Sequence, residues 1–344
     1  MSASTEDKAK PQGGEGSGGK GSGGEAKDGS TKAIIAALLS NLGIALTKFV
    51  AFLLTASSSM LAESIHSLAD TGNQGLLLLG RKGAQKAPDE THPFGFGRVR
   101  YVYAFLVAVV LFTVGGLFAI YEGYEKIKEP HELESAPIAI GVLLVAILLE
   151  SFSLRTAVKE TGEVKGEQSY WSFIKTSRIP ELPVVLLEDV AALTGLAFAL
   201  AGVGLSLALD EPRFDGVGTL AIGILLVVVA VILGVQMKGM LVGEAALPHE
   251  VQQIRDALAG ADGVTQVIHL RTLHLGPEEL LVAAKIETDR DADLAKVASI
   301  IDGAEAAIRA QVPSARMIFL EPDLMRDEPA DGSAADPAEK AAQQ

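Results

Sequence analysis

Long apolar segments alternate with polar stretches through most of this chain. At about 1.5 Å of helical rise per residue, each segment is long enough to cross about 30 Å of hydrocarbon. The pattern predicts six membrane-spanning helices, at residues 33–55, 57–79, 99–121, 136–158, 182–209 and 216–237. We therefore expect an all-α transmembrane domain over residues 32–241.

The apolar runs end near residue 240, and shorter periodic segments follow. Residues 248–258 and 292–311 have helical periodicity, whereas residues 264–275, 279–288 and 315–320 are rich in strand-forming side chains. This order predicts a small α+β module over residues 242–323. It is ferredoxin-like, with the order helix-strand-strand-helix-strand and helices covering one face of the sheet.

Both ends of the chain have low complexity. Residues 1–31 consist mainly of Gly, Ser and charged residues, and residues 324–344 are rich in Asp, Ala, Pro and Gln. Such segments bury too little apolar surface to offset the entropy lost on ordering. We expect both to be disordered tails.

The positive charges of the connecting segments predict the orientation in the membrane. The links between the second and third and between the fourth and fifth helices carry ten Lys or Arg residues, against three on the opposite side. Positive residues accumulate on the cytoplasmic side. We therefore expect both termini in the cytoplasm. The absence of organelle signals, together with the Ala- and Gly-rich composition, favours a bacterial inner membrane.

Composition limits the candidate partners and ligands. The formal net charge of −14 argues against nucleic acid as a partner. The chain has no cysteine, which excludes disulfides and thiolate ligands. Any metal ion must be held by His, Asp, Glu, backbone groups or water. The lipid membrane is an expected partner, and no prosthetic group is expected.

Ionisable residues interrupt the second and fifth predicted helices. His66 and Asp70 are four residues apart and therefore lie on one helical face, and Glu188 and Asp189 lie on the fifth helix. Ionisable groups at membrane depth are rare and usually functional. One imidazole with carboxylates suits Zn²⁺ and also accommodates Mn²⁺, Fe²⁺ or Co²⁺. These four side chains form the predicted metal site.

Several of these residues allow other interpretations. Glu188 and Asp189 point about 100° apart on a regular helix, so both reach one ion only if the helix is distorted, for example near Pro183. Otherwise one of them supports the site or pairs with Lys48. Lys48 itself is better explained as an ion-paired or snorkelling lysine than as a transport residue. Glu150 is explained in the same way, as a residue near the inner end of its helix.

Two motifs resemble the cation diffusion facilitator (cation efflux) family. They are Ala62-Glu63-Ser64-Ile65-His66-Ser67-Leu68-Ala69-Asp70 and His92-Pro93-Phe94-Gly95-Phe96-Gly97-Arg98. Together with six helices and a small α+β module, the resemblance covers about residues 32–322. It implies efflux of divalent metal, usually zinc, in exchange for protons, by a homodimer whose soluble module serves dimerisation.

This sequence departs from the family pattern at three places. Where zinc members carry a histidine on the fifth helix, this chain has Val185, and Glu188 is the nearby substitute. A second site between the second and third helices is matched by Asp89 and His92, but Phe96 stands in place of a third ligand, so we expect this site to be weak or absent. The aligned metal positions of the module are Ile268, Lys285 and Leu320, which predicts a metal-free module.

The leading hypothesis is a proton-coupled divalent metal transporter, not an enzyme. Ligands must lose their protons to bind metal, and imidazole titrates near pH 6.5, so His66 is the natural coupling group. The alternative is a non-transporting membrane scaffold of the same fold, favoured by the missing ligand at Val185. A metalloprotease is disfavoured because no His-Glu-x-x-His motif is present. The two strand histidines, His269 and His274, are more simply structural than ligands.

Overall fold

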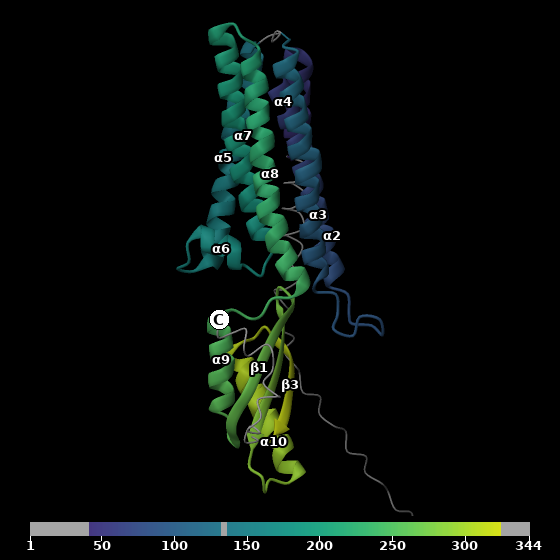
Figure 1. The fold of residues 1–344 in the computed structure, drawn as a ribbon, viewed down its shortest axis with the longest axis vertical. Helices are drawn as coiled ribbons and strands as arrows, with labels where there is room; N and C mark the ends of the chain where they lie inside the picture. Colours follow the sequence, from purple (N-terminus) through teal and green to yellow (C-terminus); the bar gives the residue numbers. More distant parts are fainter. Residues whose placement is uncertain (1–40, 132–135, 325–344) are drawn as a thin grey trace, which may run out of the picture. The chain divides into compact units, whose positions relative to one another are not determined.

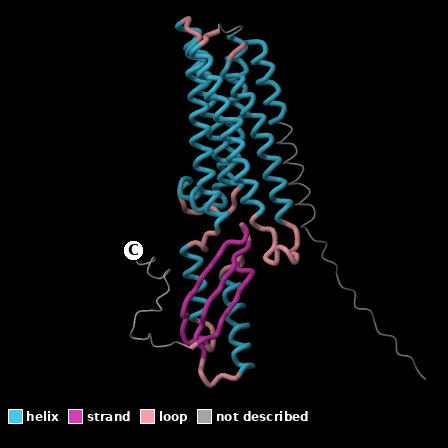
Figure 2. Tube along the Cα trace, turned by 45° about the vertical axis from the view of Figure 1, so that its right-hand side comes forward, coloured by secondary structure: helices cyan, strands magenta, loops and turns pink. Residues whose placement is uncertain are grey.

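The computed structural model describes residues 41–131 and 136–324. Within them the helices and strands follow the predicted order, and all strands lie in the C-terminal module (Figure 2). The predicted tail at 1–31, the start of the first helix and nearly all of the tail at 324–344 lie outside the described residues.

The helical part consists of long helices and a short helix (Figure 1). Its elements are the helix Asn41–Thr55, α2 Ser58–Ala84, α3 Val99–Val110, the π-helix η1 Leu111–Leu117, α4 Phe118–Lys128, α5 Ala136–Lys165, α6 Tyr170–Thr176, α7 Glu181–Leu209 and α8 Arg213–Val242. Of these, α3, η1 and α4 form one continuous helix over Val99–Lys128. The short helix α6 and the π-helical turn were not predicted.

Four helical stretches of the described chain are long and apolar enough to cross a membrane. They are Val99–Lys128, Pro137–Lys165, Glu181–Leu209 and Arg213–Val242. Helix α2 is 27 residues long but carries the polar residues of the predicted metal site. The first helix is described only over Asn41–Thr55. Multiple membrane spans are therefore supported, and the count of six stays a prediction.

Glycine allows the backbones of α8 and its neighbours to approach closely. A Cβ on Gly223 of α8 would lie 2.6 Å from the backbone nitrogen of Ile120, and one on Gly116 of η1 would lie 2.7 Å from a side-chain atom of Val227. Helix α8 also packs against α3 and α7, and α2 packs against α3 and α7. These contacts place α2 and α7, which carry the candidate ligands, side by side.

The C-terminal module matches its predicted element order. It consists of α9 Pro248–Ala259, β1 Val264–Gly276, β2 Glu279–Thr288, α10 Leu294–Gln311 and β3 Ala315–Asp323. The sheet order is β1-β2-β3, with β1 antiparallel and β3 parallel to β2. Alternate residues of β2 are buried, and they share one core with residues of α9 and α10, as expected for a sheet with one covered face.

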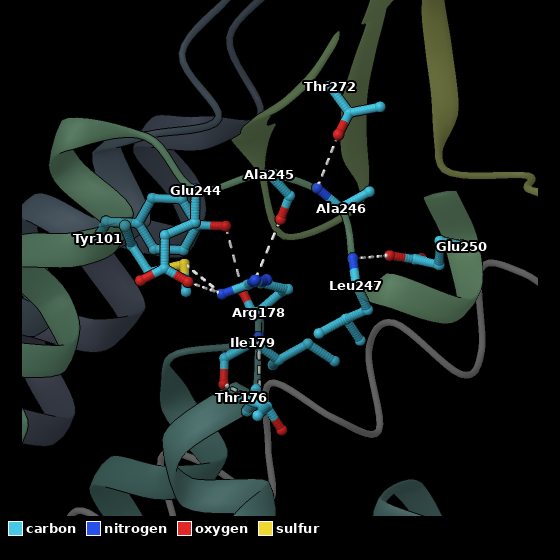
Figure 3. A network of polar contacts seen from close by, with 12 residues as sticks. Tyr101, Thr176, Arg178, Ile179, Glu244, Ala245, Ala246, Leu247, Glu250 and Thr272 are labelled. Carbon is cyan, nitrogen blue, oxygen red and sulfur yellow. Dashed lines mark hydrogen bonds and ion pairs between the residues drawn. The ribbon is translucent and has the colours of Figure 1, made fainter. Parts of the chain in front are cut away.

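A polar network holds the segment that leaves α8 (Figure 3). The Arg178 guanidinium pairs with the Glu244 carboxylate and donates to the carbonyl oxygen of Ala245 over 3.1 Å. The Tyr101 hydroxyl donates to the Arg178 carbonyl oxygen over 3.2 Å. Helix α8 ends at Val242 and is followed by Gly243, whose φ of 112° suits glycine. Because Arg178 lies just before α7, this network ties the first turn of α7 to the end of α8.

Candidate metal site

His66 and Asp70 lie near the middle of α2, on its buried side. The His66 side chain is 1% exposed, and its Nδ1 lies 3.5 Å from Asp70 Oδ1. Within the described chain, neither ring nitrogen of His66 makes a hydrogen bond, and Asp70 Oδ1 is also without a hydrogen-bond partner. A buried imidazole and a carboxylate oxygen are thus left with free ligating atoms.

Glu188 and Asp189 project from α7 toward different neighbours. Glu188 accepts a hydrogen bond of 2.7 Å from the Asn73 side-chain amide of α2, and Asp189 accepts one of 3.0 Å from the Ser153 hydroxyl of α5. This divergence is the one expected for adjacent residues on a regular helix. Pro183 lies in the first turn of α7 and the helix continues through it, so no distortion brings the two carboxylates together.

A small cavity lies between these side chains. Its volume is about 20 Å³, which is room for a water-sized particle. Asp70 contributes from α2, and Glu188 and Asp189 contribute from α7. The complete lining is Asn41, Ile44, Ser67, Asp70, Gln74, Glu150, Val185, Glu188 and Asp189. Three of the four predicted ligands therefore face one cavity, and Val185, at the position of the absent histidine, faces it as well.

The predicted ligands do not form a complete coordination shell. In residues 41–131 and 136–324, no three His, Asp or Glu side chains are placed so that they could hold one ion. His66 lies one helical turn from Asp70 but is not part of the cavity lining. Glu188 and Asp189 are instead hydrogen-bonded to Asn73 and Ser153.

Sequence reasoning missed part of this cavity. Glu150 was expected near the inner end of its helix, but α5 continues to Lys165, so Glu150 lies midway along it and lines the cavity. Asn73 and Ser153, which bind the α7 carboxylates, were not singled out as their partners. A carboxylate within an apolar run was the available indication for Glu150, whereas the two partners could be found only from the packing.

The second predicted site lies in the exposed loop between α2 and α3. Asp89 Oδ1 accepts hydrogen bonds from the backbone N–H of Thr91 and from that of His92, and His92 Nδ1 lies 3.3 Å away. The Thr91 hydroxyl and the His92 N–H hold the pKa of Asp89 below its usual value. The ring of His92 packs beside that of Phe96. Asp89 and His92 thus lie side by side, their contacts suit a stable loop, and the weak second site stays a prediction.

The aligned positions of the C-terminal module have other partners. Lys285 pairs with Asp323 at 2.9 Å and with Glu321 at 3.1 Å. His274 is 2% exposed and its ring nitrogens make no hydrogen bond within the described chain. Burial, assisted by the positive charge of Arg178, lowers the pKa of His274. His274 is therefore a neutral, buried imidazole, and His269 is exposed on the same strand.

Two family models match this chain in succession. The cation efflux transmembrane domain matches residues 34–242, and the cation efflux protein cytoplasmic domain matches residues 247–323. The chain belongs to the cation efflux family. This family, also called the cation diffusion facilitators, consists of transporters of metal cations. The polar groups on α2 and α7 lie within the part of the chain that matches its transmembrane domain.

Relatives of this cation efflux protein include metal transporters from several kingdoms. The human "proton-coupled zinc antiporter SLC30A9, mitochondrial" is 33% identical over 70% of this chain and 43% of its own length. Metal tolerance protein C4 of Arabidopsis thaliana is 28% identical over 75% of this chain and 57% of its own, and the cation-efflux pump FieF of Pectobacterium atrosepticum is 27% identical over 84% and 91%. This chain thus spans less than half the length of its mitochondrial relatives.

A solved MamM-CTD variant also matches. It is 22% identical, covers 23% of this chain and 94% of its own length, and has a TM-score of 0.22.

Proposed function

We propose that this protein exports a divalent metal cation, with Zn²⁺ as the first candidate, in exchange for protons. The observation that supports this most strongly is the cavity lined by Asp70 of α2 and by Glu188 and Asp189 of α7. These carboxylates lie within long, largely apolar helices, where ionisable groups are costly and therefore rare and usually functional. Zinc antiporters among the relatives favour the same cation.

The chemistry of the side chains supports proton exchange. Carboxylate and imidazole ligands must be deprotonated to bind a metal ion, so an arriving ion displaces protons. Protons that return from the other side of the membrane displace the ion in turn. His66, with two free ring nitrogens beside Asp70, is the group we assign to this exchange.

We assign to Glu188 the place of the fifth-helix histidine that is absent at Val185. Glu188 and Val185 line the same cavity, and Asp70 and Asp189 line it as well. In this proposal Asn73 holds Glu188 aside until an ion enters. The protein works as a homodimer, held by its C-terminal module, with both termini in the cytoplasm of a bacterial cell.

The test is metal-driven proton flux in liposomes that contain the purified full-length chain. Zn²⁺, Mn²⁺, Fe²⁺ and Co²⁺ are applied in turn to the wild type, Asp70→Asn and Glu188→Gln. We expect a flux with zinc that falls at least about tenfold in both variants, since each removes a ligand charge at no change in volume. Glu160→Gln, an exposed change on α5, serves as the matched control.

Two results would contradict the proposal. Full flux in Asp70→Asn would remove Asp70 from the ion path. Absence of flux with every metal, from protein shown to be folded and dimeric, would favour the non-transporting scaffold. Recovery of zinc flux in Val185→His with Glu188→Gln would establish that Glu188 stands in for the histidine.

A further inference from the structure

A lysine is buried beside the cavity, although the transport chemistry described above does not use it. Lys48 comes from the helix Asn41–Thr55, and its side chain is 1% exposed. Its Nζ lies 3.0 Å from Glu63 Oε2 and donates a 2.8 Å hydrogen bond to the Ser67 hydroxyl. The lysine predicted to snorkel or to pair is therefore paired, with α2 rather than with the carboxylates of α7.

The structure around Glu63 is built to hold this pair. The Glu63 side chain is fully buried, and Gly195 of α7 lies against it. A Cβ at position 195 would lie only 2.7 Å from Glu63 Oε1. The other oxygen of the carboxylate, Oε2, binds Lys48. Glycine at 195 thus leaves the space in which Glu63 holds the ammonium group of Lys48.

The ammonium group reaches the wall of the cavity through one side chain. It donates a hydrogen bond to Ser67, and Ser67 lines the cavity, although neither Lys48 nor Glu63 lines it directly. Four carboxylates face the same cavity, namely Asp70, Glu150, Glu188 and Asp189. In the low-dielectric interior a fixed positive charge next to such a group strongly opposes a second cation.

Stability alone is a weak explanation for this arrangement. A buried ion pair loses much of its Coulomb attraction to desolvation, and apolar side chains of similar volume often stabilise a fold equally well. We therefore look for the role of Lys48 in its electrostatic effect on the neighbouring cavity. Four carboxylates without a counter-charge would hold a divalent ion tightly and release it slowly.

We propose that Lys48 sets the affinity of the cavity for its ion, and that Glu63 is the positioning residue that keeps the ammonium against Ser67. This inference rests on the proposed function. Lys48 weakens the hold of the cavity on the divalent cation enough for the ion to leave. Its charge also compensates the carboxylates when the cavity holds no ion.

The test is calorimetric titration of purified full-length protein with Zn²⁺, together with zinc transport in liposomes. In Lys48→Met we expect the Kd for zinc to fall about tenfold or more, because a nearby positive charge is removed. The maximal transport rate should fall as well, because release slows. Lys48→Arg keeps the charge and should restore a Kd close to that of the wild type. Lys159→Met, at an exposed position of α5, is the matched control.

A second variant covers a failure of Lys48→Met to fold, since that change leaves Glu63 buried and unpaired. Lys48→Met with Glu63→Gln removes both charges and leaves no lone charge behind. Because the ammonium is the charge that contacts Ser67 of the cavity wall, we expect this double variant to bind zinc more tightly than the wild type. Merely structural pairing would leave the Kd unchanged.

The outcomes separate the two proposals. An unchanged or weaker Kd in the folded double variant, with normal binding by the wild type, would overturn the role of Lys48 alone. If the wild type binds none of Zn²⁺, Mn²⁺, Fe²⁺ and Co²⁺, the proposed function fails and this inference fails with it.

Discussion

At the scale of single residues, the buried polar side chains differ in whether their polar atoms have hydrogen-bond partners. Asp70 and His66 keep ligating atoms free, whereas Glu188 and Asp189 are held by hydrogen bonds to neighbouring helices. His274 in the C-terminal module has two free ring nitrogens as well, but it is enclosed and neutral. A polar atom without a hydrogen-bond partner is therefore not by itself evidence of a binding site.

The buried state of His274 makes stability depend on pH. Burial lowers its pKa in the folded state below the ordinary value of about 6.5, so the unfolded chain binds the proton more readily. The contribution of neutral His274 to the free energy of unfolding is fully present above about pH 6.5. It decreases as the pH falls from there toward the pKa of His274 in the folded state.

His274→Phe should remove this acid sensitivity. We expect the Tm of the full-length wild type in detergent to fall more between pH 7.5 and pH 5.5 than that of the variant, since phenylalanine has no proton to bind. Differential scanning fluorimetry measures both. His269→Phe, on the exposed part of the same strand, is the control. Equal pH dependence in His274→Phe and the wild type would contradict a neutral His274.

At the scale of elements, close helix packing decides which residues meet. Helix α8 approaches α4 and η1 through glycines, and α2 and α7 pack directly against each other. The Arg100 guanidinium makes a bidentate pair with Glu181, at 2.7 and 2.8 Å, and so joins α3 to the first turn of α7. These contacts position the turn of α7 that carries the two carboxylates.

Gly223→Ala should disrupt the packing of α8 on α4. The added Cβ would lie 2.6 Å from the backbone nitrogen of Ile120, so the helices must move apart. We expect the free energy of unfolding to fall by about 1–3 kcal/mol, the usual range for overpacking. Gly234→Ala is a control on the same helix, because a Cβ there meets nothing within 4 Å.

Thermal unfolding of the two variants in the same detergent checks this packing. Gly234→Ala should be neutral or up to about 1 kcal/mol more stable, since alanine favours helix over glycine. A drop in Tm of the same size in both variants would mean that the glycine of α8 matters for flexibility and not for the approach of α4.

At the scale of the whole molecule, the expected orientation can be tested directly. The chain has no cysteine, so a single introduced thiol is the only one present. Glu129 follows α4 on the predicted outer side, and Glu90 lies in the predicted inner loop; both are exposed. In intact cells a membrane-impermeant maleimide should label Glu129→Cys nearly completely and leave Glu90→Cys largely unlabelled.

Permeabilised cells provide the control for that measurement, because both thiols must then react. Labelling of Glu90→Cys alone in intact cells would reverse the topology predicted from the positive charges. Labelling of both would mean that the segments between these positions do not separate two compartments.

The sequence by itself determined the order of elements, because periodicity and apolar length reflect local geometry. It also singled out Asp70, Glu188 and Asp189 as candidate ligands, because a charge within an apolar run is conspicuous. Packing alone revealed that Glu150 and Val185 face the same cavity, that Asn73 and Ser153 hold the α7 carboxylates apart, and that Lys48 pairs with Glu63 beside Ser67. Those contacts join residues distant in sequence, and they depend on how helices rotate and approach, which no local pattern records.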